Sequence, residues 1–144
     1  MSNFGSEQIE QLKLAGLELP EVNQIELHVW NQQPALCAYC QREGIVVMSF
    51  CPLARCKLFG QSDLAKLAEE TGRSEAALCL RWLLQRGYVT IPKSTNAQRI
   101  KSNAVFGEGS ELSVEQMERM DALDQGFLAS NACKAQNLPW EQIR

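Results

Sequence analysis

Three short strand candidates alternate with helical patterns along this chain, and this alternation limits the folds that it can adopt. They cover residues 22–28, 45–50 and 88–91. Strands that alternate with helices are typical of a parallel sheet with helices outside it. The run at 45–50 is apolar throughout, which predicts a strand buried on both faces. The sequence therefore predicts an α/β fold in which residues 1–144 form one unit.

Capping residues and glycines predict where the helices begin and end. Asn31 is expected to cap one helix, with Pro34 in its first turn. Ser113 and Gln116 form a capping box for the last helix. The expected helices cover residues 6–15, 33–43, 62–71, 74–86, 97–104 and 113–125.

The turn after the third strand candidate is the strongest candidate for a binding site, because it joins a strand to a helix. Thr95 and Gln98 fit a capping box, which predicts a helix start at Ala97 and leaves first-turn N–H groups free to face an anion. An ammonium, hydroxyls, a guanidinium and the positive helix end would then meet in one small volume, as a phosphomonoester requires. The polar residues of this site are Lys93, Ser94, Thr95, Arg99 and Asn103.

Charge and hydropathy exclude several classes of partner. The formal net charge is −3 and the chain has no basic tract, which argues against nucleic acid as a partner. No apolar run approaches the ~18 residues that span a membrane, and the N-terminus lacks the pattern of a signal peptide. We therefore expect a cytoplasmic protein that binds neither nucleic acid nor membranes.

The cysteines are expected to be free thiols. The chain has six of them and no secretory signal. Cys37 and Cys40 form a C-x-x-C, for which a redox or zinc role is the alternative to a structural one. Both fall inside the expected helix at 33–43, and no second Cys or His pair at zinc-finger spacing accompanies them. We therefore expect no metal site.

Three segments together resemble the aldo-keto reductase family. The pattern I-P-K-S-x-x-x-x-R-x-x-x-N at 91–103 is similar to the family's signature for the 2′-phosphate of NADP. The segment E-V-N-Q-I-E-L-H at 21–28 resembles the family's sixth strand, and I-V-V-M-S-F-C-P-L at 45–53 resembles its seventh strand with the following turn. Their order and spacing match as well as their letters.

The resemblance implies a partial (β/α)8 TIM barrel with about the last three βα units and the C-terminal helices. A complete barrel takes roughly 250 residues and seldom fewer than about 200, whereas this chain has 144. The letters S-N-F-G at 2–5 resemble the turn after the family's fifth strand. The family's catalytic tyrosine, aspartate, lysine and histidine all precede that turn, so no catalytic residue is expected here.

The resemblance also implies NADP(H) as the cofactor, and assigns one group of residues to its nicotinamide. Ser2 and Asn3 match the pair that binds the nicotinamide amide, although a chain end is expected to fray. Gln24 matches a further partner of that amide, with a polar residue filling the barrel interior as the alternative. Phe50 matches the aromatic that stacks on the nicotinamide, with an ordinary core aromatic as the alternative.

A second group is assigned to the phosphates. Cys51, Pro52 and Leu53 match the turn that runs along the pyrophosphate, and Arg55 is a candidate for pairing with it. The 2′-phosphate is assigned to Lys93, Ser94, Thr95, Arg99 and Asn103. Solvated surface cations are the alternative for the charged members. Arg99 rather than Lys93 is expected to select NADP over NAD, because a planar guanidinium binds phosphate bidentately.

The remaining candidates for chemistry are expected to be structural. His28 ends the sixth-strand pattern and does not match the catalytic histidine. Tyr39 belongs to an outer helix, and Tyr88 begins a strand at the face opposite to that of barrel sites. Neither tyrosine has a lysine and an aspartate arranged to lower its pKa. Trp140 belongs to the segment at 127–144, which resembles the part of the family that closes over substrate.

Two interpretations of function follow. The first is an NADP(H)-dependent aldo-keto reductase of a small aldehyde or ketone, of which this chain carries the cofactor-binding half and is inactive alone. The second is a non-catalytic truncated isoform or fragment that binds or complements another chain. Three strands do not close a barrel. Because the sheet edges stay open, we expect the isolated chain to be marginally stable, to aggregate, or to depend on a chain that supplies the other barrel half.

Overall fold

A parallel sheet lies at the centre of the structure, a computed structural model that describes residues 1–61, 63–104 and 109–130. The sheet has three strands in the order β1-β2-β3. The strands are β1 (Val22–Glu26), β2 (Val46–Phe50) and β3 (Val89–Thr90). This parallel order confirms the predicted α/β class.

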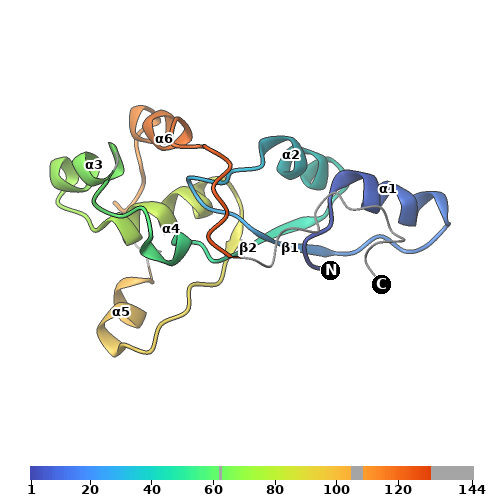
Figure 1. Cartoon of the computed structure of the whole chain (residues 1–144), viewed down its shortest axis with the longest axis horizontal. Helices are drawn as coiled ribbons and strands as arrows, with labels where there is room; N and C mark the ends of the chain where they lie inside the picture. The colour runs from blue at the N-terminus through green and yellow to red at the C-terminus, as the bar shows by residue number, and fades with distance from the viewer. Residues whose placement is uncertain (62, 105–108, 131–144) are drawn as a thin grey trace.

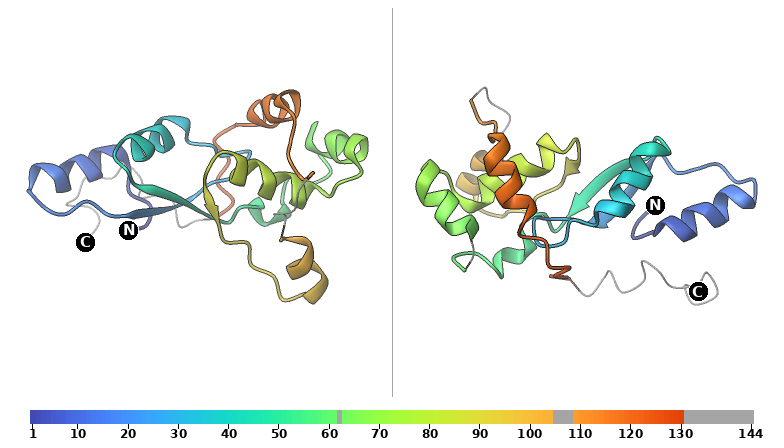
Figure 2. Two further views of the ribbon diagram at one scale, coloured as in Figure 1. Left: turned by 180° about the vertical axis from the view of Figure 1, so that it is seen from behind. Right: turned by 90° about the horizontal axis from the view of Figure 1, so that it is seen from above.

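Helices follow the strands at the predicted places. They are α1 (Ser6–Leu14), α2 (Pro34–Arg42), α3 (Asp63–Thr71), α4 (Glu75–Gln85), α5 (Ala97–Ser102) and α6 (Val114–Asp121), with a 3-10 turn η1 (Ala54–Cys56) after β2. The molecule is elongated, with α1 and α2 toward one end and α3, α4 and α6 toward the other (Figures 1 and 2). The short helix α5 projects away from the rest (Figure 1).

Of the three capping residues named from the sequence, Ser113 is confirmed and two are wrong. Ser113 caps α6 in the predicted capping box, and Ser74 caps α4 at the start of the helix expected at 74–86. Gln33 rather than Asn31 precedes α2, because the Asn31 side chain instead donates to the carbonyl of Glu26 at 2.8 Å.

The start of α5 at Ala97 is as predicted, but the capping residue is Asn96 rather than Thr95. Asn96 Oδ1 accepts from the backbone N–H of Arg99 at 3.0 Å. This bond uses one of the first-turn N–H groups that were expected to face an anion.

The two faces of the sheet are covered unequally. Ile25 and Val47 belong to the core that packs against α2 and are only 0% and 2% exposed. On the opposite face, Val46 and Val89 are 44% and 41% exposed. The prediction that 45–50 is buried on both faces is therefore wrong, because no described element covers this second face of β2.

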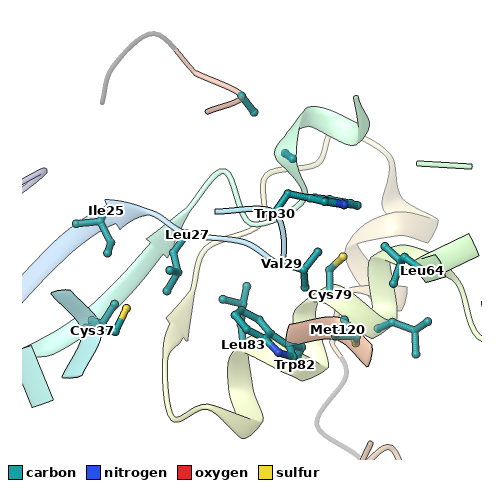
Figure 3. Close-up of a cluster of buried hydrophobic side chains, with 14 of the residues drawn as sticks. Ile25, Leu27, Val29, Trp30, Cys37, Leu64, Cys79, Trp82, Leu83 and Met120 are labelled. Atoms are coloured by element: carbon teal, nitrogen blue, oxygen red, sulfur yellow. The ribbon is translucent and has the colours of Figure 1, made fainter. Parts of the chain in front are cut away.

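Large apolar side chains fill the helix-covered side. Trp30 and Trp82 are almost completely buried, and Leu83 and Met120 are wholly so. Figure 3 shows these side chains gathered between the end of β1 and helices α4 and α6. A core of this kind supplies most of the stability of a small domain.

The strands are shorter than predicted. β1 ends at Glu26, and His28 then pairs with Asn31 in an isolated antiparallel bridge. β3 has two residues, although the N–H of Ile91 still donates to Ser49 at 3.2 Å. Pro92 cannot donate a further bond, so the chain leaves the sheet there.

Candidate functional site

The carboxyl ends of the parallel strands share one edge of the sheet, and a cleft opens at this edge. Its volume is 420 Å³. The lining residues follow β2 and β3, and they are Cys51, Pro52, Leu53, Arg55, Cys56, Ile91, Pro92 and Lys93. In α/β folds, ligands bind in the crevice outside the carboxyl ends of the strands. The cleft therefore joins the segments expected at the pyrophosphate and the 2′-phosphate.

The turn after β2 has an unusual backbone. Cys51, Ala54, Arg55 and Cys56 all have left-handed dihedrals, with φ of 54°, 47°, 53° and 57°. Each such residue costs roughly 1–2 kcal/mol unless it is glycine. Strained backbone of this kind clusters at ligand-binding sites. Cys51, Arg55 and Cys56 of this turn also line the cleft.

The two cations assigned to the 2′-phosphate, Lys93 and Arg99, differ in their relation to the cleft, because only Lys93 is among its lining residues. Lys93 lines the cleft at the end of the third strand. Arg99 lies on α5, close enough to Cys56 for its positive charge to act on that thiol. Burial raises the pKa of Cys56, and the Arg99 guanidinium opposes this shift. Cys56 also lines the cleft, so Arg99 lies near a wall of the cleft that Lys93 lines. Both cations are exposed, and their binding to one phosphate stays a prediction.

The remaining residues of the phosphate turn shape it. Ser94 Oγ accepts from the backbone N–H of Asn96 at 3.1 Å, which folds the turn back on itself. Thr95 is exposed at the tip of the turn. Asn103 ends α5, and its N–H donates to the carbonyl of Arg99 at 2.9 Å. Arg99 and Asn103 are therefore one helical turn apart.

Ser2 and Asn3 are joined to β1. Ser2 forms a parallel bridge with Gln24, and its hydroxyl donates to the Gln24 carbonyl at 3.0 Å. The N–H of Asn3 donates to the same carbonyl at 2.9 Å. The structure thus holds this segment against the sheet, where fraying was expected, and brings together the three residues expected at the nicotinamide amide.

Gln24 and Phe50 lie on the less covered face of the sheet. The Gln24 amide contacts Met48 Sδ at 3.3 Å on the neighbouring strand. Phe50 ends β2 and is half-buried. Cys51 and Leu53 follow it and are also half-buried.

Both tyrosines have pKa values raised above the ordinary value. Burial raises the pKa of Tyr39, and its hydroxyl donates to Glu10 at 2.6 Å, which raises it further. Burial and the neighbouring Cys37 raise the pKa of Tyr88. A general acid at neutral pH needs a pKa lowered toward 7. Both shifts go in the opposite direction.

The five described cysteines are all free thiols, as the sequence predicts. Burial raises the pKa of Cys37 to about 11 and also raises that of Cys40, which suppresses the reactive thiolate. No cluster of His, Cys, Asp and Glu that could hold a metal occurs among the described residues. None of the described helices is long and apolar enough to cross a membrane.

The structure reveals a buried polar cluster that the sequence interpretation missed. The carboxylate of Glu26 is fully buried and accepts hydrogen bonds from the backbone N–H groups of Ala129 and Ser130. His28 lies beside it, with Nε2 3.2 Å from Glu26 Oε1. The sequence feature that could have indicated this cluster is an acidic residue at an inward position of a predicted strand.

Trp140, which the sequence assigns to the segment at 127–144, lies outside the described residues.

Comparisons with known proteins agree with this geometry. A family model described as "Aldo/keto reductase family" matches residues 1–125. An uncharacterised oxidoreductase of Caenorhabditis elegans is 38% identical over 144 residues, which cover 96% of this chain and 44% of that protein. Glyoxal reductase of Bacillus subtilis is 40% identical, over 86% of this chain and 45% of that protein.

Solved structures give the same result. An aldo-keto reductase of Bombyx mori, in complex with NADP, superposes with a TM-score of 0.79 and 32% identity. The match covers 96% of this chain and 48% of that one. The chain therefore spans about half the length of the relatives that it matches. Its sheet and helices form part of a (β/α)8 barrel, as predicted.

Proposed function

Because this chain belongs to the aldo/keto reductase family, we propose that it forms the NADP(H)-binding part of a carbonyl reductase. The observation that supports this most directly is one cation in the cleft and a second beside a residue that lines it. Lys93 lines the cleft together with Cys56, and the Arg99 guanidinium on α5 acts on the Cys56 thiol. Two cations at the carboxyl edge of a parallel sheet suit a phosphate.

The cofactor is NADP(H), by analogy with the Bombyx mori relative, whose structure holds NADP. Arg99 and Lys93 bind the 2′-phosphate, together with Ser94, Thr95 and Asn103. The turn of Cys51 and Leu53 follows the pyrophosphate. At the other end of the cofactor, the nicotinamide amide is held by Ser2, Asn3 and Gln24, and the nicotinamide ring stacks on Phe50.

The reaction of the complete reductase is hydride transfer between NADPH and an aldehyde or ketone. The cofactor supplies the hydride, and the residues of this chain bind and orient it. A carbonyl also needs a proton donor, and Tyr39 and Tyr88 both have raised pKa values. We therefore expect this chain to bind cofactor and, by itself, to reduce nothing.

A partner chain is part of the proposal. On the less covered face of the sheet, Val46, Val89 and Ile91 are 44%, 41% and 43% exposed. Apolar strand residues of this kind normally meet further strands. The other strands of a reductase barrel would cover them and would bring the catalytic residues to the nicotinamide. This observation also favours the second candidate function, a fragment that complements another chain.

Replacement of Arg99 by alanine tests the cofactor site. Arg99→Ala should weaken NADPH binding by about 10- to 100-fold, because a hydrogen bond to a charged group is worth about 1.5–3 kcal/mol. Quenching of tryptophan fluorescence on NADPH addition measures the affinity. Lys101→Ala is the matched control, since it removes an exposed cation from the same helix. NADPH affinity that does not change in Arg99→Ala, or equal binding of NADH and NADPH by the unaltered chain, contradicts the proposal.

Oxidation of NADPH by the purified chain with a panel of aldehydes tests the second half of the proposal. We expect no turnover above the rate without protein. Turnover that disappears in Tyr39→Phe or Tyr88→Phe would show that this chain has its own proton donor. Both replacements keep the ring and remove only the hydroxyl.

A further inference from the structure

A buried carboxylate at the end of β1 holds a distant segment of the chain. Glu26 is 0% exposed, and its two oxygens accept from Ala129 N, Ser130 N and Ser130 Oγ. These residues lie more than a hundred positions away along the chain. Ala129 and Ser130 are themselves buried, at 4% and 8% exposure. Charged groups are rarely buried to this degree unless donors surround them, and here the donors are a peptide segment.

A second charged group holds the same segment from the other side. Lys57 Nζ donates to the carbonyl of Ala129 at 3.1 Å. Lys57 follows η1, directly after the residues that line the cleft. The Ala129–Ser130 peptide is thus fixed at its N–H groups by an anion and at a carbonyl by a cation.

His28 supports the carboxylate from within the core. Its Nε2 lies 3.2 Å from Glu26 Oε1, whereas its Nδ1 is buried without a hydrogen-bond partner in the described part of the chain. A neutral imidazole protonated at Nε2 explains both observations, because Nε2 then donates and Nδ1 carries no proton. The imidazole therefore adds one more donor to the Glu26 carboxylate.

The held segment lies beside the residues assigned to the nicotinamide. Side chains alternate between the faces of a strand, so Glu26 and Gln24 share the less covered face of β1. Glu26 is also the register partner of Phe50 on β2. Neighbouring strands of a sheet lie about 4.8 Å apart. A peptide bound to the Glu26 carboxylate is therefore within reach of a ring that stacks on Phe50.

On these grounds we propose that Glu26 is a positioning residue, which holds the Ala129–Ser130 peptide as a wall of the nicotinamide end of the site. The inference rests on the cofactor assignment made above. The proposal makes different predictions for the two halves of the cofactor. Loss of the Glu26 contacts should weaken binding of the nicotinamide half and leave binding of the 2′-phosphate half unchanged.

Two ligands test this separation in the full chain: NADPH, and adenosine 2′,5′-bisphosphate, which lacks the nicotinamide. Glu26→Gln removes the charge and places an amide donor against the N–H groups of the held peptide. We expect NADPH to bind about tenfold more weakly, as the loss of one charge-assisted hydrogen bond would give. The affinity for adenosine 2′,5′-bisphosphate should not change. Hydrogen exchange at the Ala129 and Ser130 amides should become faster in the same variant.

Glu21→Gln is the matched control, because it neutralises an exposed carboxylate immediately before the same strand. Lys57→Met is the second variant. It should also weaken the binding of NADPH and leave the affinity for adenosine 2′,5′-bisphosphate unchanged. If Glu26→Gln loses both ligands, its fold has changed and Lys57→Met decides the question.

The outcomes distinguish this inference from the proposed function. If the unaltered chain binds neither ligand, the cofactor assignment fails, and the positioning role fails with it. If adenosine 2′,5′-bisphosphate binds and the NADPH affinity is the same in all variants, only the positioning role is overturned. Equal weakening of both ligands by Lys57→Met overturns it as well.

Discussion

The two faces of the sheet have similar apolar sequences and different surroundings. Ile25 and Val47 face the helices and are almost fully buried, whereas Val46 and Val89 on the other face are nearly half exposed. The difference shows that an apolar run predicts a strand but does not determine how many of its faces are covered. The helix-covered face has its own core, and the second face carries the residues assigned to the cofactor. Stability and binding should therefore respond to different substitutions.

The largest effect should come from the helix-covered face. Leu83→Ala removes a fully buried side chain and should lower the free energy of unfolding by about 2–5 kcal/mol, because it leaves a cavity. Val46→Ala removes apolar atoms from the exposed face and should cost less than about 1 kcal/mol. Urea denaturation of both variants measures the difference. Equal losses would mean that the second face is also packed in solution.

A smaller effect should depend on pH, through the only histidine of the chain. Burial lowers the pKa of His28 below its usual 6.5, although its contact with Glu26 opposes the shift. Unfolded His28 binds a proton near pH 6.5, while the folded form does so only at lower pH. Because the unfolded state binds more protons in this window, the free energy of unfolding should fall as the pH drops from about 6.5 toward the folded pKa.

Denaturation of the unaltered chain and of His28→Gln, at a series of pH values between about 5 and 7, isolates this dependence. In the variant, the free energy of unfolding should depend less on pH, because the imidazole no longer contributes. If the free energy of unfolding depends on pH equally in both proteins, His28 binds protons equally in the folded and unfolded states. Water would then reach His28 in the folded protein more than the structure indicates.

How far the sequence predicts this molecule depends on how local each feature is. The six α-helices and three strands follow from local periodicity and capping patterns, although the strands are shorter than predicted. The binding of one phosphate by Lys93 and Arg99 stays a prediction. The cap of α2 was predicted wrongly because the Asn31 side chain bonds to Glu26 instead. The hydrogen bond between Ser130 and the Glu26 carboxylate joins residues more than a hundred positions apart, so no local pattern could indicate it.

The turn after β2 was also beyond local prediction, because left-handed dihedrals at Ala54 and Arg55 follow from the path of the chain between strand and cleft. Cysteine is not a residue that favours this conformation, yet Cys56 adopts it with φ of 57°. The turn after β2 thus contains four residues with left-handed backbone, whereas the segment that enters α2 on the helix-covered side contains one, Gln33 with φ of 46°. This difference leads to the prediction with the smallest expected effect.

Cys56→Gly should raise the free energy of unfolding by about 0.5–1 kcal/mol. Removing the Cβ atom relieves roughly 1–2 kcal/mol of left-handed strain, and the greater chain entropy of unfolded glycine offsets about 0.5–1 kcal/mol of that gain. Ala122→Gly is the control, since Ala122 is exposed at the end of α6 with φ of −68° and should lose stability on the same change. Thermal and urea denaturation measure both variants. Destabilisation in both would mean that the turn after β2 relaxes in solution, and that the cleft is shaped without stored strain.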